Sequence, residues 1–349
     1  MTTTVADSLV CPACGAAAAV GDRFCEACGA ELPVDKSAAP AADLPPEKDY
    51  AADLPVTPPC PSCGAPGNQI QDGYCGQCGM RQPAPRDHQE QTRPNAAAVT
   101  DRGRRHRRNE DAFAFDVTAD GAALMAVVCD GVSSTVDPDL ASQAAADAAL
   151  AVLLEGGDLV AAHAAAQAAA VAVADPDRPP PAGLGWPSCT FLAAVVRGPS
   201  VELATMGDCR TFWLPMPGPG ADASAGEPVT LTTDDSWAAE TVAAGTMTAE
   251  EASASPFAHT ITRWLGLDAD PTWTPRLVSF RATGPGLLIL CSDGLWNYAE
   301  TAAEVAAAAG PDPDGDLVTV ARRLVSFANE GGGHDNITVV AVDLKGEGS

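Results

Sequence analysis

The hydrophobic pattern of the chain changes near residue 96, where short apolar segments begin to alternate with longer segments of helical periodicity. Residues 111–117 (DAFAFDV) alternate between apolar and polar positions, whereas residues 123–130 (ALMAVVCD) are almost continuously apolar. The first pattern predicts a half-exposed strand and the second a buried one. The same reasoning predicts further strands at 189–196, 201–208, 286–294 and 336–344, and helices at 138–154, 159–174 and 317–329.

Several of these strands follow one another closely enough to form hairpins, and the helices lie between the hairpins. The pattern therefore predicts an α/β fold of the α-β-β-α sandwich type, with two packed, mostly antiparallel sheets flanked by helices. The expected modules are two small cysteine-rich units at 9–32 and 59–82, a Pro/Ala-rich linker at 33–58, a polar linker at 83–95 and one large domain at 96–345.

The two small units are an internal repeat of paired cysteines. Eight of the twelve cysteines fall in four Cys-x-x-Cys-Gly motifs, two in each copy: Cys11, Cys14, Cys25 and Cys28, then Cys60, Cys63, Cys75 and Cys78. Two thiolates at this spacing can reach one ion, and the glycine permits the positive φ of a tight turn. Each copy is therefore predicted to be a zinc ribbon with one structural Zn²⁺. Redox-active cysteine pairs are the weaker alternative, because no βαβ unit surrounds them.

Composition and charge exclude some classes of function. The chain has 349 residues with 46% hydrophobic residues and a formal net charge of −26, and the first 95 residues carry six basic and twelve acidic side chains. General electrostatic attraction to nucleic acid or to an anionic membrane is therefore not expected, for the ribbons or for the whole chain. The start of the sequence lacks the pattern of a signal peptide, and no segment resembles a membrane span, so we expect a cytoplasmic protein.

Aspartates stand at the ends of several apolar strands. They are Asp130, Asp208, Asp293 and Asp335, and Glu110 with Asp111 precedes another strand. One Asp-Gly pair is usually just a turn, but so many carboxylates at buried strand ends need partners or cations. Hard oxygen ligands without a nearby histidine favour Mg²⁺ or Mn²⁺ over Zn²⁺.

At this point the large domain resembles the type 2C, metal-dependent Ser/Thr protein phosphatase family. The resemblance rests on an ordered series of motifs: RRHRRNEDAF, VVCDGVSS, SCTFLAAVV, MGDCRTFWL, LTTDDSW, ITRWLGL, LILCSDGLWN and GGGHDNITVVAV. Each motif alone is weak, but their order over residues 97–344 is specific. The resemblance implies hydrolysis of phosphoserine and phosphothreonine by a water that bridges two Mn²⁺ or Mg²⁺ ions.

The resemblance also implies roles for individual residues. Asp130 would bridge the two ions, and the Gly131 carbonyl would bind one of them. Asp293 and Asp335 would bind the other ion, Glu110 and Asp111 would act on the first directly or through water, and Asp208 could help to hold a third. Asn336 would orient Asp335 through a hydrogen bond. The substrate phosphate would be held by His106, Arg105 and Arg108, although the arginine-rich loop could also be simply solvated.

Three positions depart from the family pattern. His106 stands where an arginine usually binds phosphate, and a neutral imidazole binds phosphate less strongly than a guanidinium. Val132 follows Asp130-Gly131, so the histidine that protonates the leaving group is missing there. Asp235 stands where the family often has a histidine. These departures keep a second hypothesis open, a catalytically weak or inactive scaffold that binds protein partners through its zinc ribbons.

Overall fold

The computed structural model describes residues 9–10, 12, 17–18, 58–216, 226–310 and 316–344. The cysteines of the first predicted ribbon, and all of the predicted 33–58 linker except Pro58, lie outside these residues. Strands β1 (Leu9–Val10) and β2 (Ala17–Ala18) pair antiparallel. The contacts divide the chain into two compact units, Met1–Ile70 and Gln71–Ser349, and the division falls inside the second cysteine-rich module.

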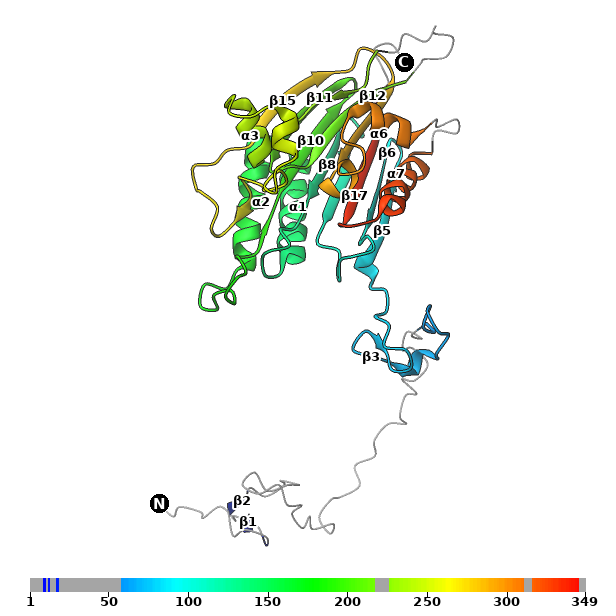
Figure 1. Ribbon diagram of the computed structural model, residues 1–349, viewed down its shortest axis with the longest axis vertical. Coiled ribbons are helices and arrows are strands. Elements are labelled where there is room, and N and C mark those ends of the chain that lie inside the picture. The colour runs from blue at the N-terminus through cyan, green and yellow to red at the C-terminus, as the bar shows by residue number, and fades with distance from the viewer. Residues whose placement is uncertain are drawn as a thin grey trace. The chain divides into compact units, whose positions relative to one another are not determined.

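The larger unit is built on two antiparallel sheets (Figure 1). The five-stranded sheet has the order β15-β11-β10-β8-β7. Its strands are β7 (Ala112–Val117), β8 (Leu124–Cys129), β10 (Phe191–Arg197), β11 (Ser200–Met206) and β15 (Arg276–Arg281). The six-stranded sheet has the order β13-β12-β16-β17-β6-β5. Its strands are β5 (His88–Arg93), β6 (Ala96–Asp101), β12 (Arg210–Pro215), β13 (Val229–Thr230), β16 (Gly286–Cys291) and β17 (Ile337–Leu344).

Helices cover the outer face of each sheet (Figure 1). Helices α1 (Pro138–Leu154) and α2 (Leu159–Val173) pack on the five-stranded sheet, and α6 (Ala302–Ala309) and α7 (Leu317–Gly331) pack on the six-stranded sheet. The short elements are α3 (Trp237–Ala243), α4 (Ala249–Ser253), α5 (Asp293–Trp296), and the paired strands β9 (Ser188–Cys189) and β14 (Leu265–Gly266). No helix in the described ranges is both long and apolar enough to span a bilayer.

Three hydrophobic cores hold these four layers together, so the predicted α-β-β-α sandwich is confirmed. The middle core, between the sheets, includes Phe115, Leu192 and Leu288. The outer cores lie beneath α1 and α2 and beneath α5, α6 and α7. Buried alanines at every fourth position of α1 and α2 (Ala141, Ala145 and Ala149; Ala162, Ala166 and Ala170) leave the two helices room to pack closely.

The prediction of a polar linker at 83–95 is wrong, because most of these residues belong to the folded domain. Residues Pro85–Asp87 form a 3₁₀ turn, and β5 pairs with β6 as the edge strand of the six-stranded sheet. Arg93 in β5 makes a two-pronged ion pair with Asp116 in β7, at 2.8 and 3.0 Å, which ties the edges of the two sheets together. The folded domain therefore begins before residue 96.

Candidate metal centre

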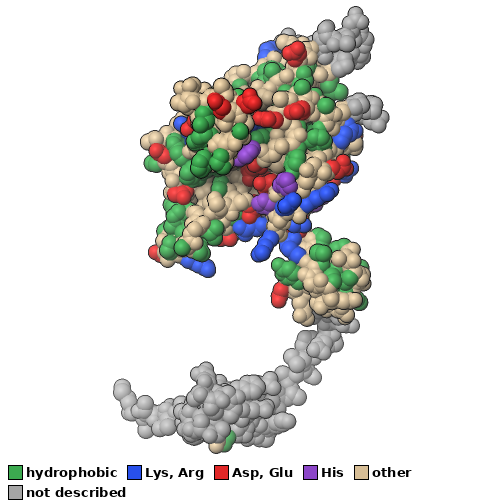
Figure 2. Space-filling view, in the orientation of Figure 1, with side chains coloured by type: hydrophobic (Ala, Val, Ile, Leu, Met, Phe, Trp, Pro, Cys, Tyr) green, Lys and Arg blue, Asp and Glu red, His purple; other side chains and the backbone are tan. Residues whose placement is uncertain are grey.

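The predicted acidic residues come together where strands of both sheets end. Asp130 directly follows β8, and the register pairs Ala112 with Cys129, so Asp111 lies opposite Asp130. In the other sheet, Asp293 follows β16 and Asp335 precedes its neighbour β17. Asp208 lies in the connection between β11 and β12. Figure 2 shows acidic side chains gathered in a hollow of this face, with histidine and basic side chains beside them.

Burial and mutual repulsion perturb these carboxyl groups strongly. Burial, followed by the charges of Asp111, Asp293 and other nearby aspartates, raises the pKa of Asp130 well above its ordinary value. Burial likewise raises the pKa of Asp111 to about 6, and burial together with Asp234 raises the pKa of Asp208 to about 7. Such a set of carboxyl groups repels itself at neutral pH unless cations neutralise it.

The carboxylate oxygens fit a hard divalent cation. Asp111 uses one oxygen to accept hydrogen bonds from Ser292 Oγ and Thr338 Oγ1, both at 2.7 Å. Its other oxygen, Oδ1, and Oδ1 of Asp293 are buried, and neither accepts a hydrogen bond from any residue in the part of the chain that the structure describes. A buried carboxylate oxygen left without a donor is costly, and cations such as Mg²⁺ or Mn²⁺ supply the missing interaction.

The glycines after Asp130 and Asp293 serve close backbone approach rather than a turn. A Cβ on Gly131 would lie 2.6 Å from the Glu110 carbonyl oxygen, and a Cβ on Gly294 would lie 1.8 Å from that of Asn336. Each glycine thus lets the segment that carries one acid pack against the segment that carries another. The explanation of these Asp-Gly pairs as ordinary turns does not hold.

Asn336 acts differently from the role predicted for it. The hydrogen bond to Asp335 Oδ1 comes from the main-chain N–H of Asn336, at 2.8 Å. The Asn336 side chain instead accepts from the Glu110 N–H at 2.7 Å and donates to the carbonyls of Arg102 and Arg108. It therefore holds both ends of the arginine-rich loop against the centre.

The predicted phosphate-binding residues are only partly gathered at the centre. The His106 ring lies between two carboxylates, with Nε2 3.2 Å from Asp335 Oδ1 and Nδ1 3.7 Å from Glu110 Oε2. The nearby Glu110 carboxylate is the main cause that raises the pKa of His106 above its ordinary value. Arg108 pairs with Glu110 at 3.0 Å and with Asp139 at 3.1 Å, whereas Arg105 is exposed.

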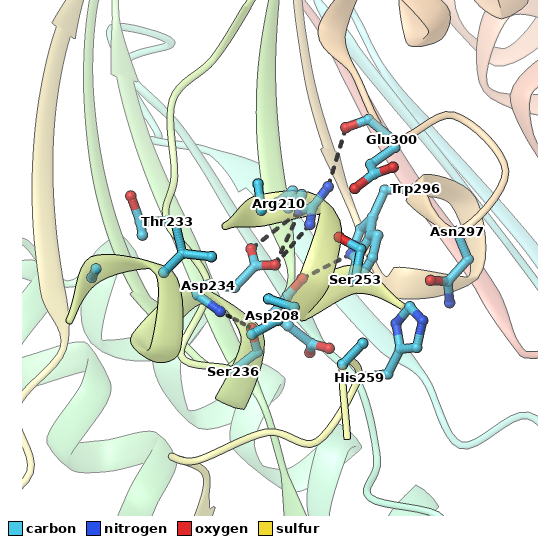
Figure 3. A pocket seen from close by; sticks show the side chains of 17 residues that line it. Asp208, Arg210, Thr233, Asp234, Ser236, Ser253, His259, Trp296, Asn297 and Glu300 are labelled. Atoms are coloured by element: carbon cyan, nitrogen blue, oxygen red, sulfur yellow. Dashed lines mark hydrogen bonds and ion pairs between the residues drawn. The ribbon is translucent and has the colours of Figure 1, made fainter. Parts of the chain in front are cut away.

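A cavity of about 570 Å³ adjoins the centre at Asp208 (Figure 3). Trp296 forms part of its wall and donates from Nε1 to the Asp208 carbonyl at 2.8 Å. The Arg210 guanidinium stacks 3.7 Å from the centre of the Trp296 ring and makes a two-pronged ion pair with Asp234. These contacts fix the backbone that carries Asp208.

Asp235, the third departure from the family pattern, is fully buried beside this cavity's wall. It accepts hydrogen bonds from Arg276 Nε at 2.8 Å and from the Gly207 N–H at 3.3 Å. Asp235 therefore supports the backbone next to Asp208, a role that its place in the sequence did not reveal.

Other functional contacts were also missed from the sequence. Ser133 Oγ donates to Glu110 Oε2 at 2.5 Å. Arg86, from the segment predicted as a linker, reaches the carbonyls of Asn109 and Asp111. No local pattern could have found either contact, because each depends on segments that are distant in the sequence.

The second cysteine-rich module forms a compact four-sulfur cluster. The Sγ atoms of Cys60, Cys63, Cys75 and Cys78 all lie within 4.8 Å of one another, as one tetrahedral Zn²⁺ requires. Its two knuckles are built alike: Gly64 donates to the Cys60 carbonyl and Gly79 to the Cys75 carbonyl, both at 2.8 Å and both with φ of 72°. The predicted role of glycine after each of these cysteine pairs is confirmed.

Comparisons with known proteins agree with both parts of the chain. A family model described as a double zinc ribbon matches residues 11–79. The serine/threonine protein phosphatase PstP of Mycobacterium tuberculosis is 33% identical over 255 residues, which are 71% of this chain and 44% of that protein. The chain thus spans less than half the length of this curated relative.

Solved structures give the same result for the larger unit. The catalytic domain of PstP in complex with two manganese ions is 30% identical, with a TM-score of 0.54 over 72% of this chain and 98% of that one. The PPM Ser-Thr phosphatase MsPP of Mycobacterium smegmatis, in complex with cacodylate, is 29% identical, with a TM-score of 0.57 over 73% and 100%. The larger unit has an acidic centre between two sheets and matches the PstP catalytic domain, at 30% identity, over nearly the whole of that domain. This chain therefore belongs to the PPM (type 2C) family of metal-dependent Ser/Thr protein phosphatases, with a double zinc ribbon before the phosphatase domain.

Proposed function

We propose that this protein is a metal-dependent phosphatase of phosphoserine and phosphothreonine in proteins. The observation that carries the proposal is the convergence of carboxylates from both sheets, where Oδ1 of Asp111 and Oδ1 of Asp293 are buried with no hydrogen-bond donor among the described residues. Two Mn²⁺ or Mg²⁺ ions bound there would supply an activated bridging water and neutralise the phosphoryl oxygens. The manganese-bound relative supports the same choice of ion.

The chain's own residues have distinct tasks in this proposal. Asp130 and the Gly131 carbonyl, with Glu110 and Asp111 beside them, would hold one ion, and Asp130, Asp293 and Asp335 would hold the other. Asp208 would contribute to a weaker third position. Ser292 and Thr338 orient Asp111 by donating to its second oxygen. Oδ1 of Asp111 and Oδ1 of Asp293, which accept no hydrogen bond from the described residues, would face the ions.

His106 and Arg108 would contact the substrate phosphate at the rim of the centre. Both already lie against Glu110, so they are near the place where a phosphate would approach. Their positive charge would offset part of the acidic surroundings. Because the whole chain carries a net charge of −26, we expect substrates whose phosphorylated residue has basic neighbours.

The zinc ribbons are proposed to recruit a protein partner, and the substrates are proposed to be targets of a Ser/Thr protein kinase. A cytoplasmic location and the lack of nucleic-acid binding remain predictions from the sequence. A catalytically inactive scaffold is the weaker hypothesis, because the sequence retains every carboxylate that is proposed to bind the metals.

The test is hydrolysis of an aryl phosphate and of a phosphothreonine peptide, with and without added Mn²⁺. Asp130→Ala and Asp293→Ala should abolish the metal-dependent rate. Asp116→Ala is the matched control, since that carboxylate pairs with Arg93 away from the centre. A wild-type rate no higher than that of the two centre variants would contradict the proposal and favour the scaffold.

A further inference from the structure

Arg86 lies in the 3₁₀ turn Pro85–Asp87, before the first strand of the phosphatase sheets. Its guanidinium is directed into the domain and donates to three backbone carbonyls. Nε donates to Asn109 at 2.9 Å, and Nη2 donates to Asp111 at 3.1 Å and to Asp139 at 2.8 Å. Nη1 donates to the side chain of Gln143 at 2.8 Å. Arg86 therefore joins the turn to the Glu110–Asp111 segment and to helix α1.

The carbonyls that Arg86 holds flank Glu110 on both sides. The carbonyl of Glu110 itself accepts from Ser142 Oγ at 2.5 Å, so three successive carbonyls each have a side-chain donor. Strand β7 begins only at Ala112, and the strand ladder therefore does not fix this segment. Side-chain donors take the place of the ladder where the acidic pair is presented.

Asn109 completes the link from the opposite direction. It is fully buried and donates from Nδ2 to the Arg86 carbonyl at 3.2 Å and to Thr100 Oγ1 at 2.8 Å. The two residues thus exchange hydrogen bonds, since each donates from its side chain to the main chain of the other. This reciprocal contact fixes the turn and the acidic segment relative to each other.

The turn itself is anchored by Asp87, which is buried. Its carboxylate accepts from Arg81 Nη1 at 2.6 Å and from the Ala84 N–H at 2.9 Å, and its carbonyl accepts from the Arg102 N–H at 2.7 Å. Arg86 is therefore held on a rigid support rather than on a mobile linker.

We propose that Arg86 is a positioning residue for the metal centre: it fixes the backbone on both sides of Glu110 and thereby directs the Glu110 and Asp111 carboxylates into the centre. The planar guanidinium can serve several carbonyls at fixed angles, which a lysine ammonium cannot reproduce. Residues that orient metal ligands typically change metal affinity or activity by about 10–100-fold when they are replaced. This inference rests on the proposed function, since it assumes that the centre binds metal.

The test compares Arg86→Met and Arg86→Lys with wild type in the full-length protein. Mn²⁺ affinity is measured by calorimetry, and kcat and KM are measured with an aryl phosphate. We expect Arg86→Met to bind Mn²⁺ about tenfold more weakly and to lose kcat with little change in KM. Arg86→Lys should show the same losses to a smaller extent. Arg93→Gln is the matched control, because it removes a two-pronged pair from adjacent β5 without touching the centre, and all three quantities should stay within about twofold.

A structural role alone would lower the unfolding midpoint of the Arg86 variants but leave Mn²⁺ affinity and kcat at wild-type values, and that result overturns the inference. If Arg86→Met does not fold, Arg86→Lys decides, because it keeps the charge and the aliphatic stem. Wild-type protein that neither binds Mn²⁺ nor hydrolyses the substrate refutes the proposed function itself. The two failures are therefore distinguishable.

Discussion

The acidic centre should make the metal-free protein less stable than an uncharged variant. Asp111→Asn tests this, because the new side chain has nearly the same shape and still offers an oxygen to Ser292 and Thr338, which donate at 2.7 Å. Only the charge and the unpartnered Oδ1 are removed. Asp111 is 2% exposed, so solvent screens that charge poorly.

The expected gain follows from the pKa of Asp111, which burial raises from 3.8 to about 6. A raised pKa means that the native state favours the protonated acid. The free energy of unfolding that protonated Asp111 contributes is fully present at pH values below its pKa in the unfolded chain. It is lost as the pH rises through its pKa in the native protein. Because the native and unfolded pKa values of Asp111 differ by about two units, its ionisation lowers the free energy of unfolding of the wild type by about 3 kcal/mol at pH 7.5. At pH 4.5 the loss is only about 1 kcal/mol. Asp111→Asn should be more stable than wild type by these amounts.

Urea unfolding in the presence of a chelator, followed by tryptophan fluorescence, measures the effect. All six tryptophans lie at or beyond Trp186, so the signal reports on the phosphatase domain. Added Mn²⁺ should then raise the stability of the wild type more than that of the variant, because ligand binding to the native state stabilises it. Equal stability of the two proteins at pH 7.5, or a difference that does not change with pH, would refute the reasoning.

Three further predictions concern other parts of the domain. Arg276→Gln removes the nearer of the two arginines beside buried Asp235 and should cost about 1.5–3 kcal/mol in urea unfolding. Arg197→Gln, which breaks the exposed pair with Glu202, should cost less than about 1 kcal/mol, and equal costs would contradict this. Burial lowers the pKa of His163, so the wild type should lose stability as the pH falls from 7 to 5, and His163→Leu should flatten that slope in thermal unfolding; parallel slopes would argue against it. Gly294→Ala places a Cβ 1.8 Å from a carbonyl oxygen and should weaken Mn²⁺ binding in calorimetry, whereas Gly284→Ala, which meets nothing within 4 Å, should leave affinity unchanged; unchanged affinity in both would exclude the close-approach role.

The layers and the acidic centre could be predicted because their signals are local. Strands such as β8 and β16 are buried at every position, and an aspartate within two residues of the end of such a strand is conspicuous. The burial cost of those charges already indicated cations. The spacing of Cys60, Cys63, Cys75 and Cys78 likewise predicted that their four thiols come together at one zinc site, without any knowledge of the fold.

Strand β5 could not be predicted because its sequence, HQEQTR, has no apolar face. It lies at the edge of its sheet and is held by main-chain pairing with β6, which the sequence does not display. Because this segment was predicted to be a linker, the contacts of Arg86 with the acidic segment were not predicted either. Its hydrogen-bond partners lie 23 or more residues away in the sequence.

The side-chain role of Asn336 was missed for a similar reason. The sequence placed it beside Asp335, but the side chain reaches Glu110, which is 226 residues away. Such contacts depend on how the two sheets pack. Only the folded arrangement determines them.

The most direct test of the account is phosphate release from a phosphothreonine peptide over a Mn²⁺ titration, with wild type and Asp130→Asn measured side by side. The account predicts that the wild-type rate rises from background to saturation with Mn²⁺, and that the variant stays near background at the same concentrations. A wild-type rate that does not depend on Mn²⁺, or an Asp130→Asn titration that matches it, would contradict the claim that these carboxylates form a catalytic metal centre.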